Sequence, residues 1–491
     1  MGIIARIMEQ PADRIAVQSG ESAISYGRLL ADVDAAAASF RGERIGGGST
    51  VGIRAGSAEN GHSYANWVAH LAVMKVGAAH VSLTDAQSIR ASLQAGRVDA
   101  VIGSFESLID VPASVRRIQF HVDPEAPAAL ADAGADEEAS ASRLNLTSGT
   151  TGKPKFVAWD GAMIERRIDQ VGEGGVIDRE TRLFPLLHLR TTAGFRYPMA
   201  VWAAGGCVLL PKARKGLDRD REALPSSTLV ISSPAQLKER LSGIPGEWPG
   251  RDGRTIMLLG GRLPATMREA ALERACARLL TSYGATETGS IAVGDHQLLD
   301  RHPGAVGFLR PGVEVEIVNG RGEPVAAGEP GLVRTRTAVM AADYENASAN
   351  AGRSHFRDGW FYPGDVGRLY EDGLLAIEGR AGDTLNLGGW KVAASELEAR
   401  VGELAGVLDV CAVAMQFPEG DRLAFGIVCS DDIDLRSLKA RIRQLVSQRR
   451  PFELVRMPMI PRNAMGKIPR ALIASQLVAL YGARQKNAAN A

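Results

Sequence analysis

The 491-residue chain lacks the long apolar runs and the bias toward one charge that would assign it to several common classes of protein. No stretch approaches the roughly 18 apolar residues of a membrane-spanning helix, and the first residues show no long apolar run behind a basic region. The formal net charge is +1 and the basic residues are dispersed, which argues against a nucleic acid or another bulk polyanion as a partner. We therefore expect a cytoplasmic protein without a membrane span.

The chain is also poor in cysteine and in metal-binding patterns. Its four cysteines, Cys207, Cys276, Cys411 and Cys429, form no C-x-x-C pair, and each lies in an apolar segment. This pattern is typical of buried free thiols in a reducing compartment. The eight histidines are scattered without an H-E-x-x-H or comparable spacing, so a zinc site held by the protein alone is not expected.

What the chain does contain is an alternation of predicted strands and helices, which favours an α/β fold with mainly parallel sheets. One α/β unit is predicted over residues 14–104 and a second over about 145–295. The connector between them, residues 123–142, is rich in Ala, Asp, Glu and Pro. Short alternating runs over residues 304–378 then predict a small antiparallel sheet or barrel. An α+β unit of about 110 residues is predicted to follow. The length of the chain is consistent with several domain-sized units.

Two local predictions concern residues near possible sites. The apolar run 183–188 is predicted to be a strand that ends in His188. A helix over residues 395–404 is predicted to begin with Ser395 as its N-cap, because Glu398 follows three residues later and completes a capping box.

The richest polar segment is residues 146–155, Leu-Thr-Ser-Gly-Thr-Thr-Gly-Lys-Pro-Lys. Its glycines let backbone N–H groups converge on an anion, while its hydroxyl and lysine side chains add donors and positive charge. The glycine spacing does not fit the G-x-x-x-x-G-K-[ST] loop, and Pro154 disfavours a helix at Lys153. Clusters of this composition are more often ordinary loops, so a polyphosphate-binding role depends on the rest of the chain.

A second polar segment, residues 282–289, has the sequence Ser-Tyr-Gly-Ala-Thr-Glu-Thr-Gly and follows an apolar strand. The carboxyl ends of strands are where α/β sheets place ligands. Glu287 is a candidate Mg²⁺ ligand, because Mg²⁺ binds through one or two carboxylates together with substrate phosphates. A surface turn explains the same segment equally well.

Two further segments carry isolated charged residues. Asp365 ends the segment 360–365, Trp-Phe-Tyr-Pro-Gly-Asp, and Arg380 lies downstream; together they suit the hydroxyls of a ribose. The segment 461–469 places Lys467 after a glycine near the C-terminus. Alone, the first is a turn and the second a solvated lysine.

Taken together and in this order, the polar segments resemble the core motifs of the adenylate-forming superfamily, which includes acyl-CoA synthetases, non-ribosomal peptide adenylation domains and luciferases. The resemblance extends over nearly the whole chain and is strong as an ordered set, although each motif alone is weak to moderate. The matching segments are residues 67–83, 146–155, 183–188, 283–289, 328–336, 360–365, 379–391 and 461–468.

The resemblance implies an α/β fold with a large N-terminal AMP-binding domain, residues 1–381, and a smaller mobile α+β domain, residues 382–491. The large domain is expected to hold two α/β subdomains and the barrel-like one. The implied reaction joins a carboxylic acid to AMP with release of pyrophosphate and then passes the acyl group to a thiol. ATP, Mg²⁺ and coenzyme A as acceptor are the implied cofactors, and fatty acid metabolism is one implied setting. Because a carboxylate attacks an anionic phosphate, catalysis is expected from positioning and charge neutralisation.

The resemblance also implies roles for residues of the large domain. The β- and γ-phosphates are expected to be held by Thr147, Ser148, Gly149, Thr150, Thr151, Gly152, Lys153 and Lys155. Thr286 is expected to contact the α-phosphate, and Glu287 to hold Mg²⁺. Asp365 is expected to bind the ribose with help from Arg380. The adenine and the acyl group are expected to be bordered by Gly260, Gly261, Tyr283 and Gly284. His188 is expected near the acyl carbonyl, although an ordinary strand-end residue remains the alternative.

The C-terminal domain supplies the remaining implied roles. Lys467 is expected to bridge the carboxylate and the α-phosphate during adenylation, and rotation of the domain is expected to free that space for a thiol. The implied hinge residues are Gly382 and Asp383. The implied loop for the acceptor thiol is Gly388, Gly389, Trp390 and Lys391. The chain departs from the family pattern at Gly382, where relatives carry a charged residue, at Phe156, where a glycine is usual, and at Pro363, where a threonine is usual.

The acceptor and the acid are less specified. No carrier segment of the Gly-x-Asp-Ser-Leu type occurs in the chain, so coenzyme A is the simplest acceptor. A ligase that loads a separate carrier protein and a nucleotide-binding relative without turnover are the alternatives. Three arginines, Arg190, Arg196 and Arg262, fall in or near the segments expected to line the acid pocket. One of them could pair with a second carboxylate of the substrate, although a structural role is the more ordinary explanation.

Overall fold

A computed structural model of the chain provides the structure. It describes residues 2–54, 60–83, 89–90, 92–93, 98–109, 111–126, 138–147, 155–212, 216–261, 265–296, 302, 304–345, 355–387, 390–415, 421–430, 433–446, 451–462, 468–470, 472–478 and 480. Within these residues, no helix is both long and apolar enough to cross a membrane.

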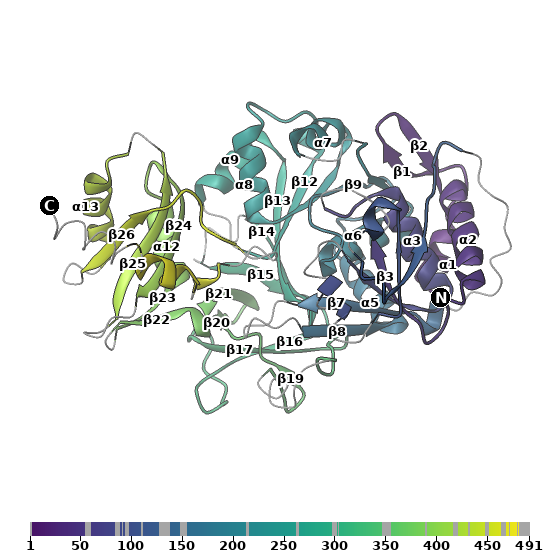
Figure 1. Ribbon diagram of the computed structural model, residues 1–491. Coiled ribbons are helices and arrows are strands. Elements are labelled where there is room, and N and C mark those ends of the chain that lie inside the picture. Colours follow the sequence, from purple (N-terminus) through teal and green to yellow (C-terminus); the bar gives the residue numbers. More distant parts are fainter. Residues whose placement is uncertain are drawn as a thin grey trace.

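A six-stranded sheet forms one half of the large domain (Figure 1). Its strands are β3 (Thr50–Arg54), β4 (Ala79–Ser82), β5 (Ala100–Gly103), β6 (Arg116–Gln119), β7 (Ser142–Thr147) and β8 (Lys155–Asp160), in the order β6-β5-β3-β4-β7-β8. All neighbours are parallel except β7 and β8, which are antiparallel. The segment 148–154 therefore connects the two strands that close one edge of this sheet. Residues 145–147 and 155–160 belong to strands of the first sheet, so the prediction that the second unit begins at about 145 is wrong.

A second, larger sheet runs through the rest of the domain, in the order β18-β19-β17-β20-β21-β15-β14-β13-β12-β11-β9-β10-β1-β2, with β16 paired to β17. Its strands are β1 (Ile15–Ser19), β2 (Ser22–Ser25), β9 (Arg182–Pro185), β10 (Cys207–Leu209), β11 (Leu229–Ser232), β12 (Thr255–Leu259), β13 (Arg278–Ala285), β14 (Gly289–Asp295), β15 (Ala305–Leu309), β16 (Val313–Val318), β17 (Gly331–Thr337), β18 (Phe356–Arg357), β19 (Trp360–Phe361), β20 (Asp365–Leu369) and β21 (Leu374–Arg380). The α/β fold class predicted from the sequence is confirmed.

The larger sheet changes character at β13. The strands β1, β10, β9, β11, β12 and β13 are parallel to one another, and β2 is antiparallel to β1 at the sheet edge. Beyond β13, β14 returns antiparallel and the following strands continue antiparallel. The antiparallel strands predicted over residues 304–378 are therefore an extension of the second sheet. The strand β1 lies within residues 14–104, the first predicted unit, but it pairs with β10 of the larger sheet.

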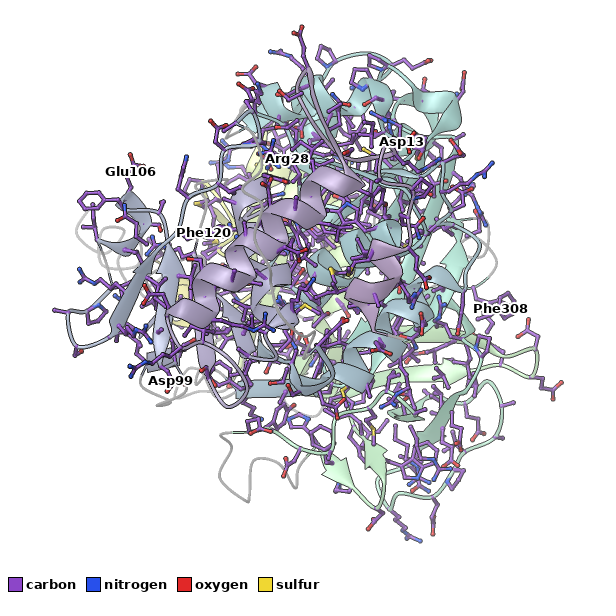
Figure 2. All side chains as sticks on the ribbon, turned by 90° about the vertical axis from the view of Figure 1, so that its right-hand side faces the viewer. Asp13, Arg28, Asp99, Glu106, Phe120 and Phe308 are labelled. Carbon is purple, nitrogen blue, oxygen red and sulfur yellow. The ribbon has the colours of Figure 1, made fainter. Side chains whose placement is uncertain are left out.

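Helices fill the space between the two sheets and cover their outer faces. They are α1 (Ile3–Met8), α2 (Tyr26–Gly42), α3 (Tyr64–Lys75), α5 (Gly161–Gly172), α6 (Thr192–Ala203), α7 (Gly216–Ala223), α8 (Pro234–Gly243) and α9 (Ala265–Arg274). Ser25 caps α2 by accepting a hydrogen bond from the backbone N–H of Arg28. Figure 2 looks onto α2, with Arg28 on the helix and Glu106 at the periphery.

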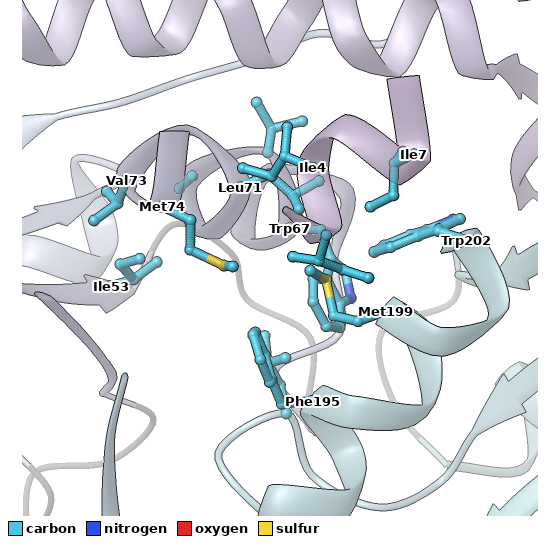
Figure 3. Packing of buried hydrophobic residues seen from close by; sticks show 14 of the residues in the cluster. Ile4, Ile7, Ile53, Trp67, Leu71, Val73, Met74, Phe195, Met199 and Trp202 are labelled. Carbon is cyan, nitrogen blue, oxygen red and sulfur yellow. The ribbon is translucent and has the colours of Figure 1, made fainter. Parts of the chain in front are cut away.

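The largest hydrophobic cluster lies where α1, α3 and α6 meet between the sheets. Trp67 of α3 packs edge-on against Trp202 of α6, with ring centroids 4.9 Å apart, and stacks on Phe195 at 5.8 Å. Figure 3 shows these rings together with Ile4 and Ile7 of α1. The helix α3 is buried almost all round because it is enclosed by the sheets and the other helices.

The C-terminal unit has its own core and stands at one end of the molecule (Figure 1). It contains β22 (Thr384–Leu387), β23 (Trp390–Ala393), α12 (Ala394–Gly402), β24 (Val407–Met415), β25 (Arg422–Cys429), α13 (Leu435–Leu445) and β26 (Phe452–Arg456). The strand β25 pairs with β24 in an antiparallel and with β26 in a parallel arrangement. The boundary between residues 381 and 382 stays a prediction.

The predicted capping box of α12 is wrong. The helix begins at Ala394 with Ala393 as N-cap, and no side chain caps it. The hydroxyl of Ser395 donates instead to the carbonyl of Glu378 at 2.9 Å, across the boundary between the two domains. Glu398 is engaged by Arg470 and by the backbone N–H of Ala412 at 2.8 Å, so tertiary partners replace the local cap.

Candidate active site

The carboxyl ends of the parallel strands β9, β11, β12 and β13 meet at one edge of the larger sheet. Gly260 and Gly261 directly follow β12, and Gly260 has φ +86° with open space where a Cβ would lie. Tyr283 and Gly284 lie near the end of β13. These four residues, predicted to border the adenine and the acyl group, therefore lie along one edge, which is where α/β sheets bind ligands.

The tight hairpin between β13 and β14 presents Thr286 and Glu287. A Cβ at Gly284 would lie 2.1 Å from the carbonyl oxygen of Gly289, so only glycine permits the two strands to approach this closely. Gly289 itself has φ +78°. The glycines thus explain why the segment 282–289 folds into a hairpin.

Glu287 is buried, with 8% of its surface exposed, and one carboxylate oxygen accepts a hydrogen bond of 2.8 Å from the hydroxyl of Tyr344. Burial and the nearby Glu287 carboxylate raise the pKa of Tyr344, which keeps its hydroxyl protonated as a donor. The ammonium of Lys155 lies 4.4 Å from the centre of the Tyr344 ring. Tyr344 thereby joins the end of the predicted phosphate loop to the predicted metal ligand.

Arg167 on α5 fixes the backbone of the hairpin, and the sequence reasoning missed it. Its guanidinium is fully buried and donates to the carbonyls of Thr286 (2.7 Å), Glu287 (2.8 Å) and Val339 (2.9 Å). It also lies 4.3 Å from the ring centre of Trp159. Burial lowers the pKa of Arg167 well below its usual range. A positive charge thus lies behind the backbone that carries the candidate metal ligand.

Asp365, Arg380 and Tyr283 form a second group. Asp365 opens β20 directly opposite Arg380 of β21, and the guanidinium lies 3.0 Å from one carboxylate oxygen. The hydroxyl of Tyr283 donates to the other oxygen at 2.5 Å. Burial, together with the charge of Asp365, raises the pKa of Tyr283. Two donors from different strands thus hold the Asp365 carboxylate in place.

His188 does not end a strand. The strand β9 ends at Pro185, because the backbone N–H groups of Leu186 and Leu187 both point to the carbonyl of Ile231 and the ladder stops there. His188 lies in the turn that leads into α6. Its carbonyl accepts hydrogen bonds from the backbone N–H and the hydroxyl of Thr191, the N-cap of that helix.

The remaining site predictions are placed only in part. Thr147 ends β7, and its hydroxyl donates to the carbonyl of Lys155 at 3.4 Å. Gly382 and Asp383 form a short 3₁₀ turn, and Asp383 lies 3.5 Å from Arg470. Trp390 and Lys391 lie in β23, paired with β22. The predicted residues outside the described part of the chain are Ser148, Gly149, Thr150, Thr151, Gly152, Lys153, Arg262, Gly388, Gly389 and Lys467.

Phe156, a departure from the family pattern, and Arg196, a candidate partner for a second carboxylate of the substrate, both lie in the interior. Phe156 points into the core of the first sheet, where it is 1% exposed. Arg196 is buried and contacts the carbonyl of Arg167 at 3.5 Å and the side-chain oxygen of Gln170 at 3.4 Å. These contacts support α5, which in turn holds the hairpin of β13 and β14.

Comparison with known proteins finds ligases that act on acids among the relatives of this chain. A 2-hydroxy-7-methoxy-5-methyl-1-naphthoate–CoA ligase of Streptomyces carzinostaticus is 29% identical over 70% of this chain, and the match spans less than two thirds of that ligase (63%). A fatty acid–[acyl-carrier-protein] ligase, MmaC, of Mycobacterium marinum is 25% identical over 96% of this chain and 97% of its own length.

The fold is similar to that of solved structures. The O-succinylbenzoate coenzyme A synthetase of Bacillus subtilis, in complex with AMP, has a TM-score of 0.82 with 20% identity, covering 96% of this chain and 97% of that one. The sequence profile described as AMP-binding enzyme matches residues 4–345, which is more than half of the chain. The chain therefore belongs to the AMP-binding enzyme family.

Proposed function

We propose that this chain is an AMP-forming acid–thiol ligase, which activates a carboxylic acid as an acyl-adenylate and transfers the acyl group to the thiol of coenzyme A. The observation that carries the proposal is the arrangement of two buried carboxylates near one sheet edge, each held by a tyrosine hydroxyl. Glu287 has Tyr344 and Lys155 beside it, and Asp365 has Tyr283 and Arg380. The family match and the CoA ligase among the relatives support it.

The residues around Glu287 fit a magnesium ion held jointly with a nucleotide. No group of three or more His, Cys, Asp or Glu side chains in the described residues could hold a metal by itself. A single buried carboxylate is what Mg²⁺ uses when substrate phosphates supply other ligands. When bound, the ion would neutralise phosphate charge. Tyr344 orients the Glu287 carboxylate, and Arg167 holds the backbone on which it stands.

The other proposed roles follow from the charges and donors of the chain. Asp365 would accept the ribose hydroxyls, while Tyr283 and Arg380 hold its carboxylate in place. Thr286 would donate to the α-phosphate, and Lys155 would face the departing pyrophosphate. Lys467 would neutralise the charge that develops between the carboxylate and the α-phosphate. Donors held in place before the reaction would lower its electrostatic barrier.

A separate carrier protein is the alternative acceptor. The relative named as an acyl-carrier-protein ligase matches this chain over nearly its whole length, whereas the match to the naphthoate–CoA ligase stops at 63% of that protein. The thiol of a carrier and that of coenzyme A present the same chemistry to the adenylate. Product analysis with each acceptor therefore decides between them.

The test is an ATP–pyrophosphate exchange screen with short, medium, long-chain and aryl acids, followed by mass spectrometry of the product. Acid-dependent exchange and an acyl-CoA product are expected. An acylated holo carrier formed without coenzyme A would instead favour the carrier-loading ligase. ATP binding without exchange for any acid would refute the proposal and leave a nucleotide-binding protein without turnover.

A further inference from the structure

Three basic side chains from three different elements converge in the interior of the large domain. They are His70 on α3, His80 on β4 and Arg143 on β7, and their exposed fractions are 0%, 0% and 1%. We call these residues the buried basic cluster. They lie within the hydrophobic core between the two sheets, beside Phe195 of α6.

Arg143 is only partly satisfied. Its guanidinium donates to the side-chain oxygen of Asn145 (3.1 Å), the hydroxyl of Ser82 (3.3 Å) and the carbonyl of Leu189 (3.0 Å). It also lies over the Phe195 ring, 3.9 Å from the ring centre. One terminal nitrogen, Nη1, has no hydrogen-bond partner among the described residues. None of these contacts supplies a negative charge.

The two histidines are less satisfied still. Their ring centres lie 5.0 Å apart. His70 meets the Ser82 hydroxyl through Nε2 at 3.0 Å, but its Nδ1 has no partner in the described part of the chain. Both ring nitrogens of His80 are likewise without a partner there. Four buried polar nitrogens, one on each of His70 and Arg143 and two on His80, thus remain open.

A neighbouring histidine shows that this core can satisfy such a group. His62 accepts a hydrogen bond from the indole N–H of Trp67 at 3.2 Å, so its other nitrogen carries the proton and donates to the carbonyl of Leu187 at 2.8 Å. Buried polar groups in folded proteins nearly always have such partners, and each exception needs an explanation. A ligand that brings oxygen acceptors would provide one for the buried basic cluster.

The cluster adjoins two parts of the candidate active site. Arg143 precedes Thr147 by four residues on β7, which is about 13 Å along a strand. Its hydrogen bond to Leu189 fixes the residue after His188, in the turn that leads into α6. A small-molecule acid could therefore span the distance between the buried basic cluster and the start of the predicted phosphate loop.

We propose that the buried basic cluster binds a second carboxylate at the far end of the substrate acid, so that the preferred substrates are dicarboxylic acids. The inference rests on the proposed function of the same site. Arg143 supplies the counter-charge through Nη1, and the neutral imidazoles of His70 and His80 each donate one hydrogen bond from the ring nitrogen that carries the proton. Because the cluster is closed to solvent, entry of the acid requires the turn 188–191, which Arg143 holds through Leu189, to open.

The test compares matched pairs of acids that differ only in the second carboxylate, such as hexanoate with adipate and 4-methylbenzoate with terephthalate. Pyrophosphate exchange is measured for the wild type, Arg143→Met and His80→Phe. The wild type is expected to favour the diacid in kcat/KM, and the ratio of diacid to monoacid should fall about 10–100-fold in Arg143→Met, the range for hydrogen bonds to a charged group. His80→Phe removes two nitrogens that have no partner, so it should fold and should also lower the ratio.

The matched control is Arg254→Met. Arg254 is 1% exposed and donates to the carbonyls of Leu224, Pro249 and Ala275, away from the cluster. Its loss should destabilise the fold without changing the ratio. An unchanged ratio in both Arg143→Met and His80→Phe would overturn the proposal.

Direct binding separates this inference from the proposed function. Calorimetry with adipate and with inorganic phosphate, without ATP, should give heat for adipate in the wild type and none in Arg143→Met. If no acid supports exchange but this difference is found, the proposed function fails and the diacid site stands. Equal adipate binding in both proteins would refute the site. If phosphate binds as tightly as adipate and its binding also depends on Arg143, the assignment of the buried basic cluster to the second carboxylate of the substrate is overturned.

Discussion

Replacement of Arg167 by methionine tests how the active-site hairpin is positioned. The carbonyls of Thr286 and Val339 would lose the donor that they share, whereas the Glu287 carbonyl would keep the backbone N–H of Ala341 at 2.8 Å. A buried carbonyl left without a donor costs about 1–3 kcal/mol, so two of them cost about 2–6 kcal/mol in unfolding free energy. Relief from burying the guanidinium, whose pKa is lowered by burial, offsets part of this cost.

The assay pairs urea unfolding with a magnesium titration of pyrophosphate exchange. Because Arg167 fixes the backbone that carries Glu287, Arg167→Met should raise the Mg²⁺ concentration for half-maximal exchange as well as lower stability. Arg254→Met is the control, since it also removes a buried guanidinium that donates to three carbonyls but lies outside the site. Equal magnesium requirements in the two variants would refute the reasoning and leave Arg167 with a purely structural role.

Three further predictions concern single side chains. Burial lowers the pKa of His62 to about 3, so below pH 6.5 the unfolded chain binds a proton that the folded chain does not. At pH 5 this difference should lower the free energy of unfolding by about 2 kcal/mol. The urea midpoint of His62→Gln should therefore depend less on pH than that of the wild type. Tyr344→Phe removes the hydrogen bond to Glu287 and should raise the Mg²⁺ requirement several-fold while leaving ATP affinity without metal unchanged. Asp365→Asn breaks the pair with Arg380 and should weaken ATP binding about 10–100-fold by calorimetry; unchanged affinity would exclude a ribose contact.

The alternation of strands and helices predicted the α/β class correctly. Buried parallel strands appear in the sequence as short apolar runs, whatever the order in which they pair in a sheet. The alternation could not assign those strands to sheets. The strand β1 and the hairpin of β7 and β8 each pair with strands far away in the sequence, and that choice depends on which faces bury one another. The antiparallel strands after β14 showed their own periodicity but gave no sign that they extend the larger sheet.

The charged residues of the candidate site were visible in the sequence, but their partners were not. Glu287, Asp365 and Lys155 were predicted from local segments. Tyr344 lies in a segment without a distinctive pattern, and only the fold brings Tyr344 and Arg167 to Glu287. An arginine within the otherwise amphipathic helix α5 was a signal, because its position falls on the buried face. A local sequence also misled where a tertiary partner was stronger, as at Ser395, whose hydroxyl reaches Glu378 instead of capping α12.

Acid-dependent exchange of radiolabelled pyrophosphate into ATP tests the central claim most directly, with wild-type protein and Lys467→Ala side by side. The account predicts exchange with at least one class of acid in the wild type. In Lys467→Ala it predicts loss of exchange with ATP binding largely retained, because the proposed role of that lysine is to neutralise charge only as the adenylate forms. Normal exchange in Lys467→Ala, or none in a wild type that binds ATP and Mg²⁺, would contradict the account.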